Sequence, residues 1–156
     1  MDLLLYIINN LWLQNYFELS TKIKLILVDI QVPLWVFTDK EALTLRYAPK
    51  SFDIENQINT FVNIVSPKDN NDGNALWVYQ KTFFYLGIFD SNTTMTYEVK
   101  IPKNGVYLFL IEGEIEVDNH VLKARDALGI IDFNLFEIRI KTKSKILLVE
   151  VPMNNS

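Results

Sequence analysis

The sequence predicts an all-β protein, a small barrel or jelly roll. Short apolar runs recur at near-regular spacing from residue 75 onward, separated by polar turns and without helical periodicity between them. The clearest run, 105–118, is apolar on both faces up to Glu112 and Gly113, after which hydrophobic and acidic residues alternate. Hydrophobic residues make up 49% of the chain, which is enough to fill one core.

Composition excludes several classes of function. A chain of 156 residues is long enough for one domain with a single core. The net charge of −4 is spread out, which argues against a nucleic-acid partner. There is no cysteine, which rules out disulfides, thiolate catalysis and cysteine-based metal sites. With one histidine, His120, the chain cannot build an imidazole-rich metal centre, and a Ser-His-Asp triad would have to use that residue.

The N-terminal region is apolar but has neither a basic leader nor a run long enough to span a membrane. We therefore expect a cytoplasmic protein without a membrane partner. Polar residues through 2–19 are spaced so that a short N-terminal helix would have a polar side. Residues 20–29 then alternate apolar with basic and polar positions, which predicts a strand.

The remaining elements follow from alternation and turn residues. Pro49 confines 51–54 to a sheet edge, because proline cannot donate to a ladder. Gly87, inside an apolar run, predicts a bulge. Turns are expected at 66–73, 103–105 and 118–120. Strands are expected at 34–37, 43–47, 61–65, 76–79, 82–89, 95–99, 106–111, 115–117, 127–131, 135–141 and 145–151.

These segments resemble a known family. Residues 61–73, with 34–37 and 45–52 ahead of them, resemble the joint between the two cupin halves of pirin-like proteins, which include bacterial quercetin-dioxygenase homologues. The second, C-terminal cupin of that family is matched by 106–117, 122–126 and 146–152. The resemblance covers about residues 31–153. It implies a cupin (RmlC-like) double-stranded β-helix over 31–153, an unmatched N-terminal segment over 1–30, and a missing metal-bearing N-terminal cupin.

The resemblance also locates the residues that would hold the family's metal. A cupin site uses two histidines, a glutamate and a third histidine that point into one end of the barrel. If Gly113 closes the first motif, the corresponding positions fall near Lys100, Pro102, Val106 and Leu128, and none of these can serve. The second motif's glycine is replaced by Arg125, a departure at a turn. We therefore expect no catalytic residue, no metal site and no cofactor.

Three polar features have both a functional and a structural interpretation, and we favour the structural one. His120 could be a ligand or base, but a hairpin tip makes it a solvated turn residue. The alternating acids of 112–118 could bind a cation, but Glu114 and Glu116 share one strand face and most simply form a solvated exterior. The three lysines of 141–145 could bind phosphate, but such a hairpin tip usually serves solubility.

Aromatic residues are the remaining candidate. They could line a pocket for a flat ligand, although we favour core packing as the simpler explanation. The possible pocket residues are Trp77, Tyr79, Phe84, Tyr97 and Tyr107.

The sequence is compatible with three functions. The preferred one is a non-catalytic pirin-like C-terminal cupin module that acts through protein or domain interaction. Loss of the partner half would uncover an apolar face, which the apolar N-terminal segment could cover within the chain. We predict instead a homodimer, or a separate N-terminal cupin partner. The alternatives are a metal-free barrel that binds a small molecule, and an oxidoreductase resembling quercetin 2,3-dioxygenase.

Overall fold

The computed structural model describes residues 3–9, 22–27, 32–37 and 47–153. The chain divides into two units, residues 1–53 and 54–156. The described residues form fourteen strands in three sheets and a short 3-10 turn, η2 (Lys68–Asn70). The all-β prediction is therefore confirmed. In the part of the chain that is described, no helix has the length and hydropathy that a membrane span requires.

The first unit holds an antiparallel sheet with the order β3-β2-β1-β4. Its strands are β1 (Leu3–Asn9), β2 (Lys22–Leu27), β3 (Val32–Phe37) and β4 (Tyr47–Phe52). β4 carries Pro49 and lies at the sheet edge, as expected for a residue without a backbone N–H.

The expected N-terminal helix is wrong over Leu3–Asn9, where β1 is a strand paired with neighbours on both sides. Tyr6, Ile7 and Ile8 favour extended backbone, and pairing with β2 and β4 satisfies the polar groups that a helix would have bonded internally. The rest of the expected helix, 10–19, lies outside the described residues. The expected boundary at residue 30 stays a prediction.

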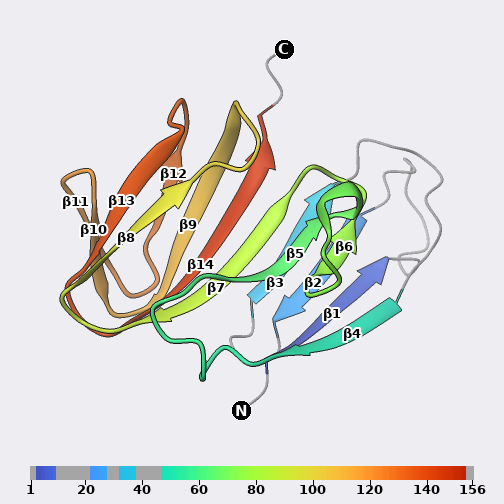
Figure 1. The fold of residues 1–156 in the computed structure, drawn as a ribbon, viewed down its shortest axis with the longest axis horizontal. Coiled ribbons are helices and arrows are strands. Elements are labelled where there is room, and N and C mark those ends of the chain that lie inside the picture. Colours follow the sequence, from blue (N-terminus) through green and yellow to red (C-terminus); the bar gives the residue numbers. More distant parts are fainter. Residues whose placement is uncertain (1–2, 10–21, 28–31, 38–46, 154–156) are drawn as a thin grey trace, which may run out of the picture. The chain divides into compact units, whose positions relative to one another are not determined.

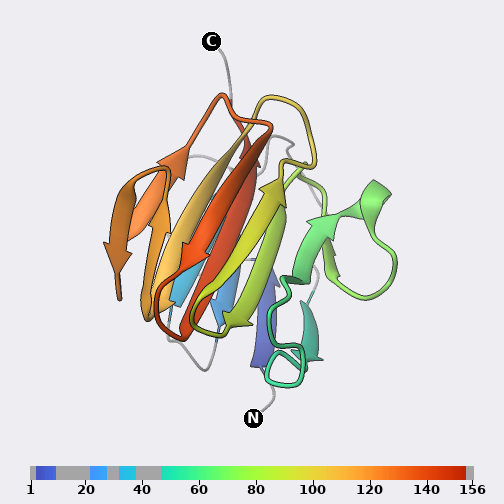
Figure 2. The ribbon, with the colours of Figure 1, turned by 60° about the vertical axis from the view of Figure 1, so that its left-hand side comes forward.

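The second unit is built from two sheets, which face each other as the two layers of a jelly roll (Figures 1 and 2). The smaller sheet has the order β11-β10-β13-β8 and the larger one β12-β9-β14-β7-β5-β6. The strands are β5 (Val62–Pro67), β6 (Leu76–Val78), β7 (Phe83–Phe89), β8 (Thr93–Glu98), β9 (Asn104–Glu112), β10 (Glu114–Val117), β11 (His120–Lys123), β12 (Ala127–Ile130), β13 (Leu135–Ile140) and β14 (Ser144–Pro152).

Alternating side chains from both sheets fill the space between them. β9 contributes Leu108 and Leu110, whereas β10 contributes Ile115 and Val117, and all four are buried. Glu114 and Glu116 face the other way, as predicted from the alternation. Aromatic rings pack edge to face inside this core, with the Phe61 and Phe89 centroids 4.8 Å apart.

The larger sheet is apolar on its second face as well. Leu86 and Leu147 are paired across β7 and β14, and both are buried, although neither belongs to the cluster between the two sheets. This explains the run that looks apolar on both faces in the sequence. β9 and β14 are interior strands with a paired neighbour on each side, and most of their side chains are buried on both faces of the sheet.

Left-handed backbone occurs at the turns where the sequence predicts reversals. Gly113, between β9 and β10, has a φ of 98°. Asp118 and Asn119 both have positive φ, as a two-residue hairpin turn requires. Arg125 has a φ of 78° and donates its N–H to the Leu110 carbonyl at 2.7 Å. The tight turn is therefore retained even though an arginine replaces the expected glycine.

The predicted bulge at Gly87 is wrong. The β7–β14 ladder runs through Gly87 in register with Ile146. The irregularities of this sheet lie between Asn63 and Val65 in the β5–β7 ladder and between Lys145 and Ile146 in the β14–β9 ladder. Gly87 is required by space, since a Cβ there would lie 2.6 Å from the Phe89 ring and 2.9 Å from the Thr60 carbonyl oxygen.

We expect Gly113→Ala to lower the free energy of unfolding by about 1–3 kcal/mol, because the methyl group adds left-handed strain and would meet the Lys143 carbonyl oxygen at 2.6 Å. Urea denaturation measures the effect. Gly129→Ala is the matched control, because nothing lies within 4 Å of the added methyl, and it should change stability by less than about 0.5 kcal/mol. Equal effects of the two substitutions would contradict this account.

Candidate functional site

A buried carboxylate lies at the end of the core where β8 connects to β9. Glu150 of β14 is completely inaccessible to solvent. It is paired with Phe83 on β7 and with Val106 on β9, whose side chains belong to the cluster between the sheets. Alternation along β14 thus directs an acidic side chain into the apolar interior.

Four donors satisfy this carboxylate. One oxygen, Oε2, accepts from the Tyr97 hydroxyl at 2.7 Å and from the Lys100 amide at 2.9 Å. The other, Oε1, accepts from the Ile101 amide at 2.9 Å and from the Asn104 Nδ2 at 2.8 Å. Hydrogen bonds of this kind offset the cost of removing a carboxylate from water. We call Glu150, Tyr97, Asn104 and the two amides the Glu150 cluster.

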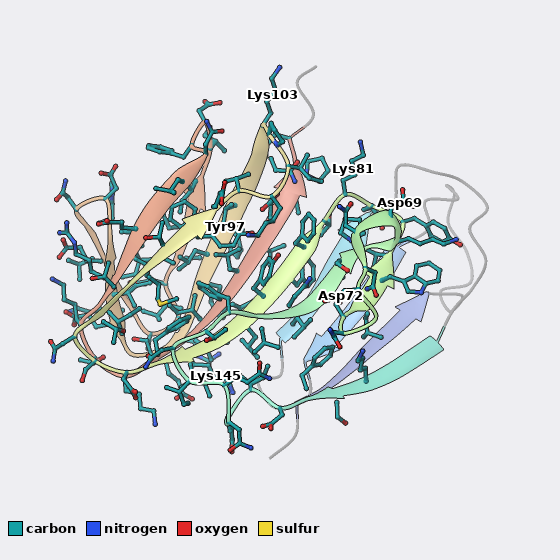
Figure 3. The ribbon with its side chains drawn as sticks, in the orientation of Figure 1. Asp69, Asp72, Lys81, Tyr97, Lys103 and Lys145 are labelled. Carbon is teal, nitrogen blue, oxygen red and sulfur yellow. The ribbon has the colours of Figure 1, made fainter. Side chains whose placement is uncertain are left out.

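The tyrosines beside the cluster remain protonated. Burial, followed by the negative charge of Glu150, raises the pKa of Tyr85 to about 12. Burial and the hydrogen bond to Glu150 raise the pKa of Tyr97 still further. The two rings lie edge to face with centroids 5.7 Å apart, and Tyr97 faces the interior (Figure 3). Tyr97 is therefore a permanent donor to the carboxylate at physiological pH.

The positions that resemblance assigns to metal ligands lie around this cluster. Lys100 is exposed, with its ammonium group 5.5 Å from the centre of the Tyr97 ring, and Pro102 is also exposed. Val106 is buried in the core, and Leu128 packs against the same core. No group of three or more potential ligands from His, Cys, Asp and Glu is found among the described residues.

These residues do not fit a cupin metal. A metal centre needs several lone pairs directed at a cation. Here four donors surround the Glu150 carboxylate, and two apolar side chains occupy positions where ligands would stand. This end of the core therefore holds the Glu150 carboxylate by hydrogen-bond donors and is not arranged to hold a cation.

The polar features singled out in the sequence lie elsewhere. His120 is exposed at the start of β11, with Nδ1 2.9 Å from the Asp118 carbonyl oxygen. Glu116 accepts hydrogen bonds from Lys141 and Arg139, and the Lys141 contact is the main reason that its pKa is lowered. The Glu116 carboxylate lies 2.7 Å from the Lys141 ammonium and 3.0 Å from the Arg139 guanidinium.

The five aromatic residues considered for a pocket are not brought together. Trp77 and Tyr79 touch edge to face at 5.3 Å, with the Lys68 ammonium over both rings. Tyr97 lies on the inner face of β8. Phe84 and Tyr107 flank Val149 on the other face of the larger sheet, Phe84 buried and Tyr107 45% exposed. Their role in ligand binding stays a prediction.

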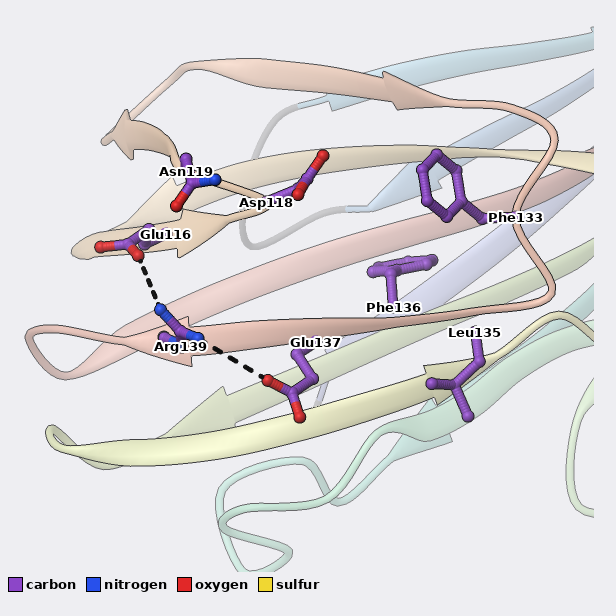
Figure 4. A pocket seen from close by; sticks show the side chains of 8 residues that line it. All are labelled: Glu116, Asp118, Asn119, Phe133, Leu135, Phe136, Glu137 and Arg139. Carbon is purple, nitrogen blue, oxygen red and sulfur yellow. Dashed lines mark hydrogen bonds and ion pairs between the residues drawn. The ribbon is translucent and has the colours of Figure 1, made fainter.

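A surface groove is present that the sequence did not reveal. It has a volume of about 390 Å³ and lies where the turn after β10 faces the start of β13 (Figure 4). The residues that line it are Glu116, Asp118, Asn119, Phe133, Leu135, Phe136, Glu137 and Arg139. The sequence feature that could have indicated the groove is the presence of apolar residues in the otherwise polar connection 131–135.

Comparison with known proteins identifies the family. The model of the quercetinase C-terminal cupin domain matches residues 63–151, which is more than half of the chain. The chain belongs to this family. No curated protein gave a significant match.

Solved structures show the same fold. YhhW from Escherichia coli is 21% identical with a TM-score of 0.69, covering 80% of this chain and 51% of that one. YhhW has also been solved as a bacterial pirin in complex with nickel(II). Quercetin 2,3-dioxygenase from Acinetobacter baumannii is 14% identical with a TM-score of 0.61, covering 77% of this chain and 44% of that one. This C-terminal cupin chain thus spans about half the length of both proteins.

The Glu150 cluster should contribute strongly to stability. We expect Glu150→Gln to lower the free energy of unfolding by about 2–4 kcal/mol, because an amide NH₂ would face donors in place of an acceptor. Tyr97→Phe should cost about 1–2 kcal/mol. Urea denaturation gives these values, and amide hydrogen exchange at Lys100 and Ile101 should accelerate in Glu150→Gln.

Glu98→Gln, on the exposed face of β8, is the matched control and should stay within about 0.5 kcal/mol of the parent. The interpretation would be contradicted if Glu150→Gln left both stability and amide exchange at the level of this control.

Proposed function

We propose that this C-terminal cupin is a non-catalytic module that acts through protein or domain interaction. The observation that carries the proposal is the occupation of the family's ligand positions: Val106 and Leu128 belong with the apolar core, and both oxygens of Glu150 are engaged by donors. Catalysis on a cupin metal needs coordinating groups with an open position for substrate. In support of the proposal, no group of three or more His, Cys, Asp or Glu side chains among the described residues is arranged to hold a metal ion.

Partners are the second part of the proposal. We infer that the chain forms a homodimer through β12, an edge strand of the larger sheet, or joins a separate N-terminal cupin in the same way. Gly129 on this strand has open space around it, and Tyr107, its neighbour across the ladder, is 45% exposed. Edge strands with apolar neighbours are favourable sites for pairing with another chain. The absence of cysteine is compatible with work in the reducing cytoplasm.

Metal analysis tests the first part. The purified chain, expressed with iron, nickel, copper and manganese supplied in the medium, should contain none of them at stoichiometric level. It should also fail to cleave quercetin when each metal is added to the assay. Metal retained at one ion per chain, or flavonol cleavage that depends on added metal, would overturn the proposal and favour the dioxygenase alternative.

Light scattering tests the second part. At high micromolar concentration the parent chain should have the mass of a dimer, and Tyr107→Glu should shift it toward the monomer by placing like charges at the contact. Tyr79→Glu, at another exposed tyrosine of the same sheet region, is the control and should leave the mass unchanged. A clean monomer for the parent chain would count against the homodimer.

A further inference from the structure

The groove described above has an apolar end and an acidic end. Phe133 and Phe136 form the first, whereas Glu116, Asp118 and Asn119 lie opposite them, and Leu135 projects from the other face of β13 (Figure 4). Glu137 and Arg139 line the side formed by β13. A volume of about 390 Å³ is sufficient for two or three side chains of a partner, within the range of ordinary binding sites.

The groove exists because one strand stops before its neighbour does. β10 pairs with β13 through Val117 and Ile138, and the chain then reverses at Asp118 and Asn119. β13 extends beyond that point to Leu135, where β8 is its remaining partner in the smaller sheet. The hollow is therefore fixed by the ladder and by a two-residue turn, so it is present before any partner arrives.

Exposed apolar residues are close together in sequence around the connection between β12 and β13, and two of them, Phe133 and Leu135, line the groove. Ile131 is 53% exposed, Phe133 50% and Leu135 54%. Three large apolar residues within five positions would be expected to lie inside a protein that acts alone. Exposed apolar groups gathered beside a hollow are characteristic of a surface that contacts another molecule.

The charges of the groove select a basic partner. Three carboxylates and one guanidinium line it. Arg139 is engaged by Glu116 at 3.0 Å and by Glu137 at 4.0 Å, and the Lys141 ammonium lies 2.7 Å from Glu116, so the selection of a basic partner depends on Asp118. Asp118 has no side-chain partner among the described residues, and it stands at the acidic end. Anionic membranes and nucleic acids are disfavoured, because the chain as a whole carries a net charge of −4.

A second copy of this chain fits the groove poorly. Two grooves face to face would oppose acid to acid. The basic hairpin tip around Lys143 could approach Asp118 of another copy, but its apolar neighbours Ile140 and Ile146 are buried and leave nothing to occupy the apolar end. The groove needs a cation and an exposed apolar side chain on the same short segment.

We propose that the groove docks a segment of another protein in which a lysine or arginine stands next to an aromatic or aliphatic residue. The apolar side chain would lie against Phe133, next to Phe136, and the cation would face Asp118. The proposal rests on the interaction function proposed above and assigns its surface.

Short synthetic peptides test it directly. The basic probe carries phenylalanine and leucine flanked by two lysines. The acidic probe replaces both lysines by glutamate, and the polar probe replaces phenylalanine and leucine by serine. Titrations followed by backbone amide resonances should show the basic probe shifting Asp118, Phe133 and Leu135, and the other two probes shifting none of them. Binding of the basic probe should weaken with salt, because an exposed ion pair contributes to it.

Single substitutions test the contributions of the apolar end and the acidic end to binding separately. Phe133→Ser should weaken binding of the basic probe about tenfold, and Asp118→Asn about two- to fivefold. Glu112→Gln, at an exposed acid at the end of β9 and outside the groove, should leave binding unchanged. Phe133 and Asp118 are exposed, so both variants should keep the parent's unfolding curve.

The proposal is overturned if the basic probe causes no shifts at millimolar concentration, shifts residues outside the groove, or binds no better than the acidic probe. A parent dimer that Phe133→Ser converts to a monomer would also overturn it, since a second copy would then be the occupant. Metal retention with quercetin cleavage would refute the proposed non-catalytic function. It would not decide whether the groove binds the basic probe, which the peptide titration measures independently.

Discussion

The carboxylate of Glu150 is the constraint on which this end of the core depends. A charged group without access to water is tolerated only when its lone pairs are filled by donors. Two of the donors are backbone amides, Lys100 and Ile101, so the loop between β8 and β9 cannot move without exposing the charge. Tyr97 and Asn104 attach the ends of β8 and β9 to the same two oxygens. One side chain of β14 therefore fixes a loop and two strands.

This arrangement differs physically from the charged contacts on the outside. Glu116 also has two partners, Arg139 and Lys141, but both basic side chains are about half exposed. Solvent screens such pairs, and their net contribution to stability is small. Inside the core there is no competing water, so each lost donor leaves a group unsatisfied. The same residue type thus has a structural role on β14 and a solubilising one on β10.

The sequence contained enough information for most of the fold but not for the site. Alternation in 114–117 and the glycine at 113 locate β10 and the turn before it, because both depend on residues close together in the chain. Glu150 could not be identified in this way. A lone acid in the apolar run 146–151 resembles a solvent-facing position, and its donors are about fifty residues away, two of them backbone groups of arbitrary residue type.

The errors at β1 and Gly87 have the same origin. Leu3–Asn9 is a strand because two neighbours pair with it, and Gly87 is needed because Phe89 and Thr60 approach it in space. The periodicity of nearby residues in the sequence predicts neither this strand pairing nor these close contacts. The groove was missed for a related reason. It depends on where β10 stops relative to β13, and a register of this kind is set by the assembled sheet.

Arg125 shows how this cupin domain retains its fold after departing from the family motif. A non-glycine residue in the left-handed region costs roughly 1–2 kcal/mol. The Arg125 amide nevertheless keeps its hydrogen bond to Leu110, and Asp126 accepts from the Lys123 amide at 2.8 Å, so the turn closes in its usual form. Its geometry therefore does not depend on a glycine. Val106 is buried in the core, Leu128 packs against it, and the charge of Glu150 is satisfied by donors, so packing and hydrogen bonds hold the paired strands together. Such a framework leaves its outer surfaces free to diverge, and the groove beside Asp118 is the surface at which we propose binding.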